Sequence, residues 1–261
     1  KSRGISIDSL NSYADSYLAL QSTEMLMKAK MVDGMMYSDK VKDAVKKMMK
    51  LEKDDDIAQL TLNDMFNVKD EKVEGDKIAI YYASGDIVQD PKAATMFDSN
   101  DYIASRKVCK DLEELMNDDD VKAVVVRINS GGGDAYASEQ MWHQMSELRK
   151  VKPVVVSMGD YAASGAYYMS APASWIVAQP NTLTGSIGIF AVIPDFSGLV
   201  TTKLGVRFDE VKTNRNSTFG NLMARPFNAE EKAMLQASVN RGYNLFRQRV
   251  ADGRRLPIES V

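Results

Sequence analysis

Two short segments of small residues could take part in catalysis, and the first is 129–134 (NSGGGD). Three consecutive glycines follow an apolar run there and precede a stretch with helical periodicity. Glycine permits positive φ angles and a close approach of a ligand, and backbone amides beside a helix N-terminus can bind a developing negative charge. The spacing fits neither phosphate-binding glycine motif, G-x-x-x-x-G-K-[ST] or G-x-G-x-x-G. A tight strand-to-helix turn without a catalytic role explains the same residues.

The second segment is 159–168 (GDYAASGAYY), in which Ser164 has only small neighbours, Ala163, Gly165 and Ala166. Small neighbours let an acyl group reach the hydroxyl, and the N–H of Gly165 can point at an oxyanion. These residues fit a serine nucleophile. Taken alone, however, the string ASGA is more typical of a helix N-cap serine or of close packing of small residues.

A serine nucleophile needs a base to remove its proton. The only histidine, His143, falls in a predicted helix near Met141, Trp142 and Met145, a setting typical of a packing or surface histidine. A Ser-His-Asp triad is therefore not predicted. A single cysteine and a single histidine cannot supply a Cys/His zinc cage, so we predict neither a metal nor another cofactor.

The elements that would position these segments alternate between strand and helix from Lys77 onward. We expect strands at 77–88, 121–130, 152–159 and 174–180. We expect helices at 105–116, at 134–149 and from Ala162 or Ala163. The first three strands are expected to be buried, and 121–130 is β-branched and nearly continuous, which is typical of a strand covered on both faces. The pattern predicts an α/β fold with a parallel sheet flanked by helices.

The first 76 residues have a different character. Residues 1–50 show helical periodicity, with Gly34 as a candidate helix stop, and the charge-rich stretch 51–76 is predicted to be a linker. The methionines from Met25 to Met49 are predicted to fill a core rather than to form a binding surface.

Composition narrows the class of protein. Of 261 residues, 44% are hydrophobic and 26% charged, as in ordinary globular proteins. The net charge of −3 and the lack of a basic block argue against a nucleic-acid partner. No apolar run reaches the length of about 18 residues that a membrane helix needs. Because the chain starts at Lys1 and stops at Val261 inside an apparent helix start, we expect a piece of a longer protein.

The segments 124–139 (VVVRINSGGGDAYASE) and 152–190, in this order, are similar to the core of bacterial signal peptide peptidases of the SppA (protease IV) family. The resemblance runs from about Lys77 to the C-terminus, and its most specific part is 182–190 (TLTGSIGIF). It implies a ClpP/crotonase-like fold and a serine peptidase. In this family the residue matching Ser164 forms the acyl intermediate, and those matching Gly132 and Gly165 form the oxyanion hole. Gly131 stands where the family has proline, which should loosen the turn and keep the donor.

The family uses a lysine as the base, and burial must lower the pKa of that lysine. Single-repeat members carry it downstream of the serine, in a segment matching 211–218 (VKTNRNST). Here Lys212 aligns with an earlier family lysine and Ser217 with the catalytic one, so the base appears at no matching position. Lys212 remains a fallback base.

Tandem-repeat members carry the lysine in the first half and the serine in the second. Because 28–47 (KAKMVDGMMYSDKVKDAVKK) resembles the end of such a first half, the resemblance implies three parts. These are the helical tail of a preceding repeat at 1–50, a linker at 51–76, and a serine-bearing domain at 77–261 that is incomplete at its C-terminus. The base would then lie upstream of Lys1, and this fragment alone should be nearly inactive.

The resemblance also implies substrates, partners and location. Family members cleave signal peptides left in the membrane. An extended peptide could bind along a strand edge. Residues 185–193 and Tyr161 could line a pocket for it, or they could pack in the core of the sheet. Relatives form ring or dome oligomers. The parent would be anchored in the inner membrane of the bacterial envelope by a region outside this fragment, with its catalytic region on the periplasmic side.

Two other functions fit the same residues. One is an acyl-CoA hydratase or isomerase on the same fold, which would also use backbone amides as an oxyanion hole but would tolerate Ser164→Ala. The other is a catalytically silent repeat that only scaffolds assembly. The missing lysine favours the silent repeat, whereas the retention of both turns argues against it.

Overall fold

The computed structural model describes residues 3–52, 76–90 and 101–261. The chain divides into two compact units. We call residues 36–188 with 245–261 the sheet unit, and residues 1–35 with 189–244 the loop unit. These boundaries differ from the predicted ones at 50 and 76, and most of the predicted linker lies outside the described residues.

The sheet unit is built on a parallel sheet with the strand order β1-β4-β5-β6, and β7 pairs with the end of β5. The strands are β1 (Lys77–Ser84), β4 (Val121–Ser130), β5 (Val154–Ala163), β6 (Trp175–Val177) and β7 (Leu183–Gly185). Two short strands, β2 (Asp86–Val88) and β3 (Tyr102–Ala104), form a second parallel pair. Every described strand pairing is parallel, which confirms the predicted α/β class.

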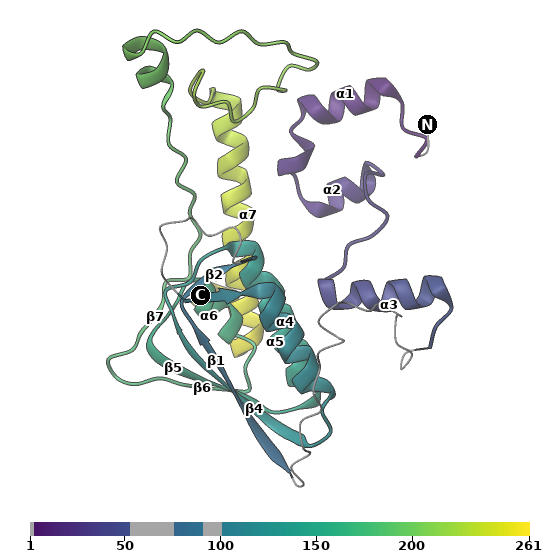
Figure 1. Ribbon diagram of the computed structural model, residues 1–261, viewed down its shortest axis with the longest axis vertical. Coiled ribbons are helices and arrows are strands. Elements are labelled where there is room, and N and C mark those ends of the chain that lie inside the picture. Colours follow the sequence, from purple (N-terminus) through teal and green to yellow (C-terminus); the bar gives the residue numbers. More distant parts are fainter. Residues whose placement is uncertain (1–2, 53–75, 91–100) are drawn as a thin grey trace, which may run out of the picture. The chain divides into compact units, whose positions relative to one another are not determined.

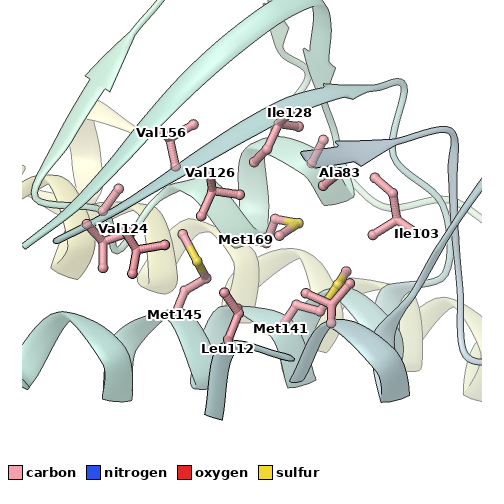
Figure 2. Close-up of a cluster of buried hydrophobic side chains, with 14 of the residues drawn as sticks. Ala83, Ile103, Leu112, Val124, Val126, Ile128, Met141, Met145, Val156 and Met169 are labelled. Atoms are coloured by element: carbon pink, nitrogen blue, oxygen red, sulfur yellow. The ribbon is translucent and has the colours of Figure 1, made fainter. Parts of the chain in front are cut away.

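Helices α4 (Ser105–Asn117), α5 (Ala135–Val151) and α6 (Gly165–Ser170) lie along one face of this sheet (Figure 1). Figure 2 shows the core between them, where the valines of β4 and β5 face the methionines and leucine of the helices. Labelled there are Val124, Val126, Val156, Leu112, Met141, Met145 and Met169. Burial of each such side chain stabilises the fold by about 1.5–3 kcal/mol.

The prediction of a strand covered on both faces was wrong. In β4, Val124, Val126 and Ile128 are buried, whereas Lys122, Arg127 and Asn129 are exposed. In β1 the outward residues include Tyr82, which is 74% exposed. Within the described residues of the sheet unit, the helices cover the face that carries the buried set. The sheet is therefore half-buried and alternates, although its runs of apolar residues hide that alternation in the sequence.

The predicted strand 77–88 is two strands, because the chain breaks at Gly85. This residue has φ +102°, and a methyl group placed on it would lie 1.7 Å from the carbonyl oxygen of Asp101. Only glycine fits such an approach. The helix expected from Ala162 or Ala163 begins later, at Gly165, because β5 continues to Ala163 and pairs there with Gly185 of β7. The helix predicted at 105–116 is confirmed as α4.

The sheet unit also contains α3 (Ser38–Met49), the part of α7 (Ala229–Arg254) from Leu245 onward, and η5 (Ile258–Ser260). A second small core holds α6 against α7, with Tyr168 and Ala171 packed on Phe246 and Val250. The rings of Tyr168 and Phe246 have centroids 4.4 Å apart. Helix α6 is therefore held from both the α5 and the α7 side.

The loop unit contains short helices and long irregular stretches. Its elements are α1 (Ile7–Asp15), η1 (Leu18–Leu20), α2 (Thr23–Lys28), η4 (Gly198–Lys203) and α7 up to Asn244. The residues 1–50 are thus largely helical as predicted, but Gly34 stops no helix, because α2 ends at Lys28. The prediction that the methionines from Met25 to Met49 fill a core was also wrong, since they are exposed both in the loop unit and on α3 of the sheet unit, where Met48 is 84% exposed. In the described part of the chain, no helix is long and apolar enough to cross a bilayer.

Candidate active site

The two turns singled out in the sequence lie beside each other. A methyl group placed on Gly132 would lie 2.8 Å from Cβ of Ser164 and 2.7 Å from the backbone nitrogen of Gly165. The reason is topological, since β4 and β5 are adjacent parallel strands and their carboxyl ends reach the same edge of the sheet. Gly132 also has φ +105°, so both its conformation and its surroundings require glycine. The structure thus brings together Ser164, Gly165 and Gly132.

Ser164 occupies a sharp turn between β5 and α6, with φ 52° and ψ −120°. A non-glycine residue in such a conformation costs about 1–3 kcal/mol and persists where its surroundings fix it. Here the N–H of Ser164 donates to the carbonyl of Gly185 and its own carbonyl accepts from the N–H of Tyr168, both at 2.9 Å. The residue is half-buried among buried neighbours. Although it stands at the N-cap position of α6, its side chain makes no capping hydrogen bond with a described residue.

The backbone amides near Ser164 differ in their availability. Gly165 is packed closely, because a methyl group on it would lie 2.3 Å from Oγ of Ser138. The N–H of Gly132 donates to Oγ of Ser130 over 3.0 Å, in a buried bond. The N–H of Gly132 could therefore donate to an oxyanion only after it leaves Ser130.

The glycine turn is tied to strand β2. The N–H of Ile87 donates to the carbonyl of Gly132, and the N–H of Asp134 donates to the carbonyl of Ile87, both over 2.9 Å. A methyl group on Gly133 would lie 2.2 Å from that carbonyl oxygen of Ile87. Asp134 then caps α5, since its Oδ1 accepts from the N–H of Ala137 at 2.7 Å. The turn is thus fixed on both sides before α5 begins.

A cleft of about 260 Å³ lies beside the glycine turn. It is lined by Ser84, Gly85, Asp86, Asp101, Asn129, Ser130, Gly131 and Tyr161. Of the residues expected either to line a peptide pocket or to pack in the sheet core, Tyr161 lines this cleft, whereas none of the residues 185–193 does. The carboxylates of Asp86 and Asp101 were not anticipated, because neither stands in a recognisable motif.

His143 lies on α5 with its side chain in a packed setting. It is 9% exposed, its ring stacks on Tyr37 with centroids 3.5 Å apart, and its Nε2 lies 2.8 Å from Oδ1 of Asp39. Burial lowers the pKa of His143, while Asp39 acts in the opposite direction. The interpretation of His143 as a packing residue thus agrees with its surroundings. The thiol of Cys109 is half-buried, and burial raises its pKa to about 12, so it stays protonated.

Lys212 belongs to the loop unit and Ser164 to the sheet unit. Its Nζ lies 3.2 Å from a carboxylate oxygen of Glu210, and its side chain is 45% exposed. An exposed and ion-paired ammonium lacks the burial on which a lysine base depends. Its role as fallback base stays a prediction. Among the described residues, no group of histidine, cysteine or acidic side chains could hold a metal ion.

The model of peptidase family S49 matches residues 146–261. Protease 4 of Salmonella typhi is 35% identical over 233 residues, which cover 89% of this chain and 36% of that protein. The chloroplastic serine protease SPPA of Arabidopsis thaliana is 31% identical over 244 residues, or 91% of this chain and 35% of that protein. The chain belongs to the SppA family.

This membership confirms the resemblance seen in the sequence. The chain spans about a third of the length of these two SppA relatives. Among solved structures, a ClpP1 mutant from Listeria monocytogenes covers 69% of this chain and 75% of its own, with 13% identity and a TM-score of 0.37. A likeness that weak adds nothing to the fold assignment, which rests on the parallel strand pairings.

Proposed function

We propose that this chain is the serine-bearing part of an SppA-type peptidase and that Ser164 is its nucleophile. The observation that carries the proposal is the approach of Gly132 to Ser164, where a methyl group on the glycine would lie 2.8 Å from Cβ of the serine. Partial exposure of Ser164 among small residues, on a turn fixed by its neighbours, supports the same role. The membership in the SppA family supports peptides as substrates.

In the proposed reaction, Oγ of Ser164 gives its proton to a base and bonds to the carbonyl carbon of a peptide. The oxyanion that forms receives hydrogen bonds from the amides of Gly165 and Gly132. The C–N bond then breaks, and the amine leaves with the proton held by the base. A water molecule next gives a proton to the base and its oxygen to the acyl carbon. The bond between that carbon and Oγ then breaks, the base returns the proton to Oγ, and the acid leaves.

We further propose that the base is a lysine of a preceding repeat. The position that aligns with the family lysine is Ser217, and Lys212 is paired with Glu210 at the surface. Two related halves would then share one dyad, and this chain alone would turn over peptides very slowly. Signal peptides as substrates, assembly into a ring or dome, and an anchored parent in the bacterial envelope belong to the same proposal, and they rest on the family.

A fluorophosphonate probe followed by peptide mass spectrometry tests the nucleophile. We expect the label on the peptide that contains Ser164 in a longer protein carrying this chain with the preceding repeat. Ser164→Ala should abolish both labelling and peptide cleavage. Ser146→Ala is the matched control, because Ser146 lies on α5 and donates to the carbonyl of Trp142. Labelling at another serine, or cleavage that survives Ser164→Ala, would refute the proposal.

One observation favours the acyl-CoA hydratase alternative, namely the carboxylates of Asp86 and Asp101 in the cleft beside the glycine turn. A hydratase of this fold would use such a carboxylate and would have no need of the serine hydroxyl. The Ser164→Ala protein therefore separates the two functions, because a hydratase would keep its activity. A silent scaffold repeat would show no labelling in any form of the protein.

A further inference from the structure

A carboxylate lies behind helix α6 and joins four helical segments of the sheet unit. Glu139 of α5 accepts a hydrogen bond from the hydroxyl of Tyr168 on α6 at 2.5 Å, and another from the hydroxyl of Tyr37 just before α3. Arg249 of α7 donates to it through Nη2 at 2.6 Å and through Nε at 3.3 Å. We call these four residues the Glu139 cluster.

The cluster is largely shielded from water and its groups satisfy one another. The side chain of Glu139 is 16% exposed, and Nη2 of Arg249 also donates to the Tyr37 hydroxyl at 2.9 Å. The guanidinium carbon of Arg249 lies 3.8 Å from the centre of the Trp142 ring. Burial and the nearby carboxylate raise the pKa of both tyrosines, so each remains a donor. Hydrogen bonds to a buried carboxylate are among the stronger and better-oriented ones in proteins.

Tyr168 connects this cluster to the turn of Ser164. It lies one helical turn after the serine, and its N–H donates to the carbonyl of Ser164 over 2.9 Å. Ser138, the residue before Glu139, touches Gly165 from the same helix, because a methyl group there would meet its Oγ at 2.3 Å. Two successive residues of α5 thus hold the first turn of α6, Ser138 at its start and Glu139 through Tyr168 at its end.

The strained conformation of Ser164 explains why these contacts on the first turn of α6 would matter. A serine at φ 52° and ψ −120° returns to an ordinary conformation if its surroundings loosen. A movement of its amide neighbour Gly165 would then turn a donor away from the oxyanion. The fold itself does not depend on the Tyr168 hydroxyl, because Met141, Met145 and Met169 pack α5 and α6 against the sheet without exposure to water.

We propose that Glu139 is a positioning residue for acyl transfer at Ser164, acting through the hydroxyl of Tyr168 on the first turn of α6. The inference rests on the proposed function of Ser164. It adds a residue that contacts neither the nucleophile nor the oxyanion, and whose partners come from distant parts of the chain.

The test compares Tyr168→Phe, Glu139→Gln and the double variant in the longer protein that carries this chain. We expect Tyr168→Phe to lower the rate of labelling by a fluorophosphonate, and kcat for a peptide, by roughly ten- to a hundredfold, because small misplacements of reacting groups cost that much. KM should stay unchanged. If Glu139 acts through Tyr168, the double variant should be no slower than the slower single variant, since effects through one contact do not add.

Glu147→Gln is the matched control, because Glu147 lies on the same helix and is about as shielded as Glu139, but it pairs with Lys150 and Lys40 and not with Tyr168. It should label at the normal rate. A normal labelling rate and kcat in Tyr168→Phe would overturn the inference, and so would fully additive losses in the double variant. If Glu139→Gln does not fold, Tyr168→Phe decides by itself.

Hydrogen exchange on this chain gives a readout that needs no activity. Tyr168→Phe should speed exchange of the amide at position 168, which donates to the carbonyl of Ser164, and leave those of β4 unchanged. Unchanged exchange at position 168 would overturn the positioning role of Glu139. Ser164→Ala keeps the two proposals apart: cleavage that survives it removes the proposed function, whereas exchange at position 168 still reports on the contact between Glu139 and Tyr168.

Discussion

The sheet unit and the loop unit differ in where their apolar side chains lie. In the sheet unit, Val124, Met145 and Met169 are fully buried between strands and helices. In the loop unit, large apolar side chains such as Phe190, which is 83% exposed, remain open to water. The sheet unit around Ser164 therefore has a hydrophobic core of its own, whereas Lys212 lies on a unit with few buried apolar side chains. Residues that need fixed geometry are thus found together on the unit that can fix them.

The glycine turn gives the largest expected effect. Gly132→Ala places a methyl group 2.7–2.9 Å from backbone and side-chain atoms of 163–165, at φ +105°. We expect a loss of about a hundredfold or more in the acylation rate, as for removal of an oxyanion donor. The rate of fluorophosphonate labelling measures it in the proposed longer protein that includes a preceding repeat.

The matched control is Gly131→Ala, because a methyl group on Gly131 meets no atom within 4 Å. It should label at nearly the normal rate. Equal losses in both glycine variants would show that the close packing of Gly132 is not what fixes this turn.

Truncation of one apolar side chain in each unit tests the difference in their cores. Met145→Ala should lower the free energy of unfolding by about 2–5 kcal/mol, because it leaves a cavity in a packed core. Phe190→Ala should change it by less than about 0.5 kcal/mol, as is usual for an exposed residue. Urea unfolding of this chain measures both. A larger effect at Phe190 would mean that the loop unit buries this ring in solution.

The pH dependence of stability should report on the packed setting of His143 in the sheet unit. Burial holds the pKa of His143 below its usual value, although Asp39 and Glu147 oppose this and Lys40 adds to it. Protonation therefore favours the unfolded chain, and the stability that neutral His143 contributes is complete above about pH 6.5 and is lost as the pH falls through the lower folded pKa. Urea unfolding at pH 7.5 and 5.5 should show this loss. His143→Asn should reduce it, and an equal loss in the variant would refute the assignment.

Lys212→Ala should have the smallest effect. An exposed ion pair such as that with Glu210 contributes about 0–1 kcal/mol, and the proposed base lies elsewhere. Peptide cleavage by the longer protein should be unchanged. If cleavage collapses while the thermal unfolding midpoint stays normal, Lys212 is the base, and the catalytic machinery extends into the loop unit.

Much of the sheet unit could be predicted from local sequence. The β-branched runs indicated β4 and β5, and adjacent parallel strands imply that their following turns meet, which places Gly132 beside Ser164. Whether helices cover one face of the sheet or both could not be predicted, because an apolar run such as 124–126 is compatible with either arrangement. The break at Gly85 depends on its contact with Asp101, which no local pattern shows.

The Glu139 cluster could not be predicted for a similar reason. Its members, Tyr37, Glu139, Tyr168 and Arg249, are ordinary surface types that lie far apart in the chain, and only the packing of α5, α6 and α7 brings them together. The bond between Gly132 and Ser130 was also missed, although both residues stand in the glycine turn. A motif identifies the residue types in a turn, whereas the direction of each amide depends on the folded backbone.

The central claim is that a serine and two amides meet where an acyl oxyanion can be bound, and an experimental structure with a peptide boronate tests it most directly. We predict a bond between boron and Oγ of Ser164, and a boronate oxygen within hydrogen-bond distance of the amides of Gly165 and Gly132. The N–H of Gly132 should have left Oγ of Ser130. A boronate attached to another side chain, or one whose oxygen points away from both amides, would contradict the account.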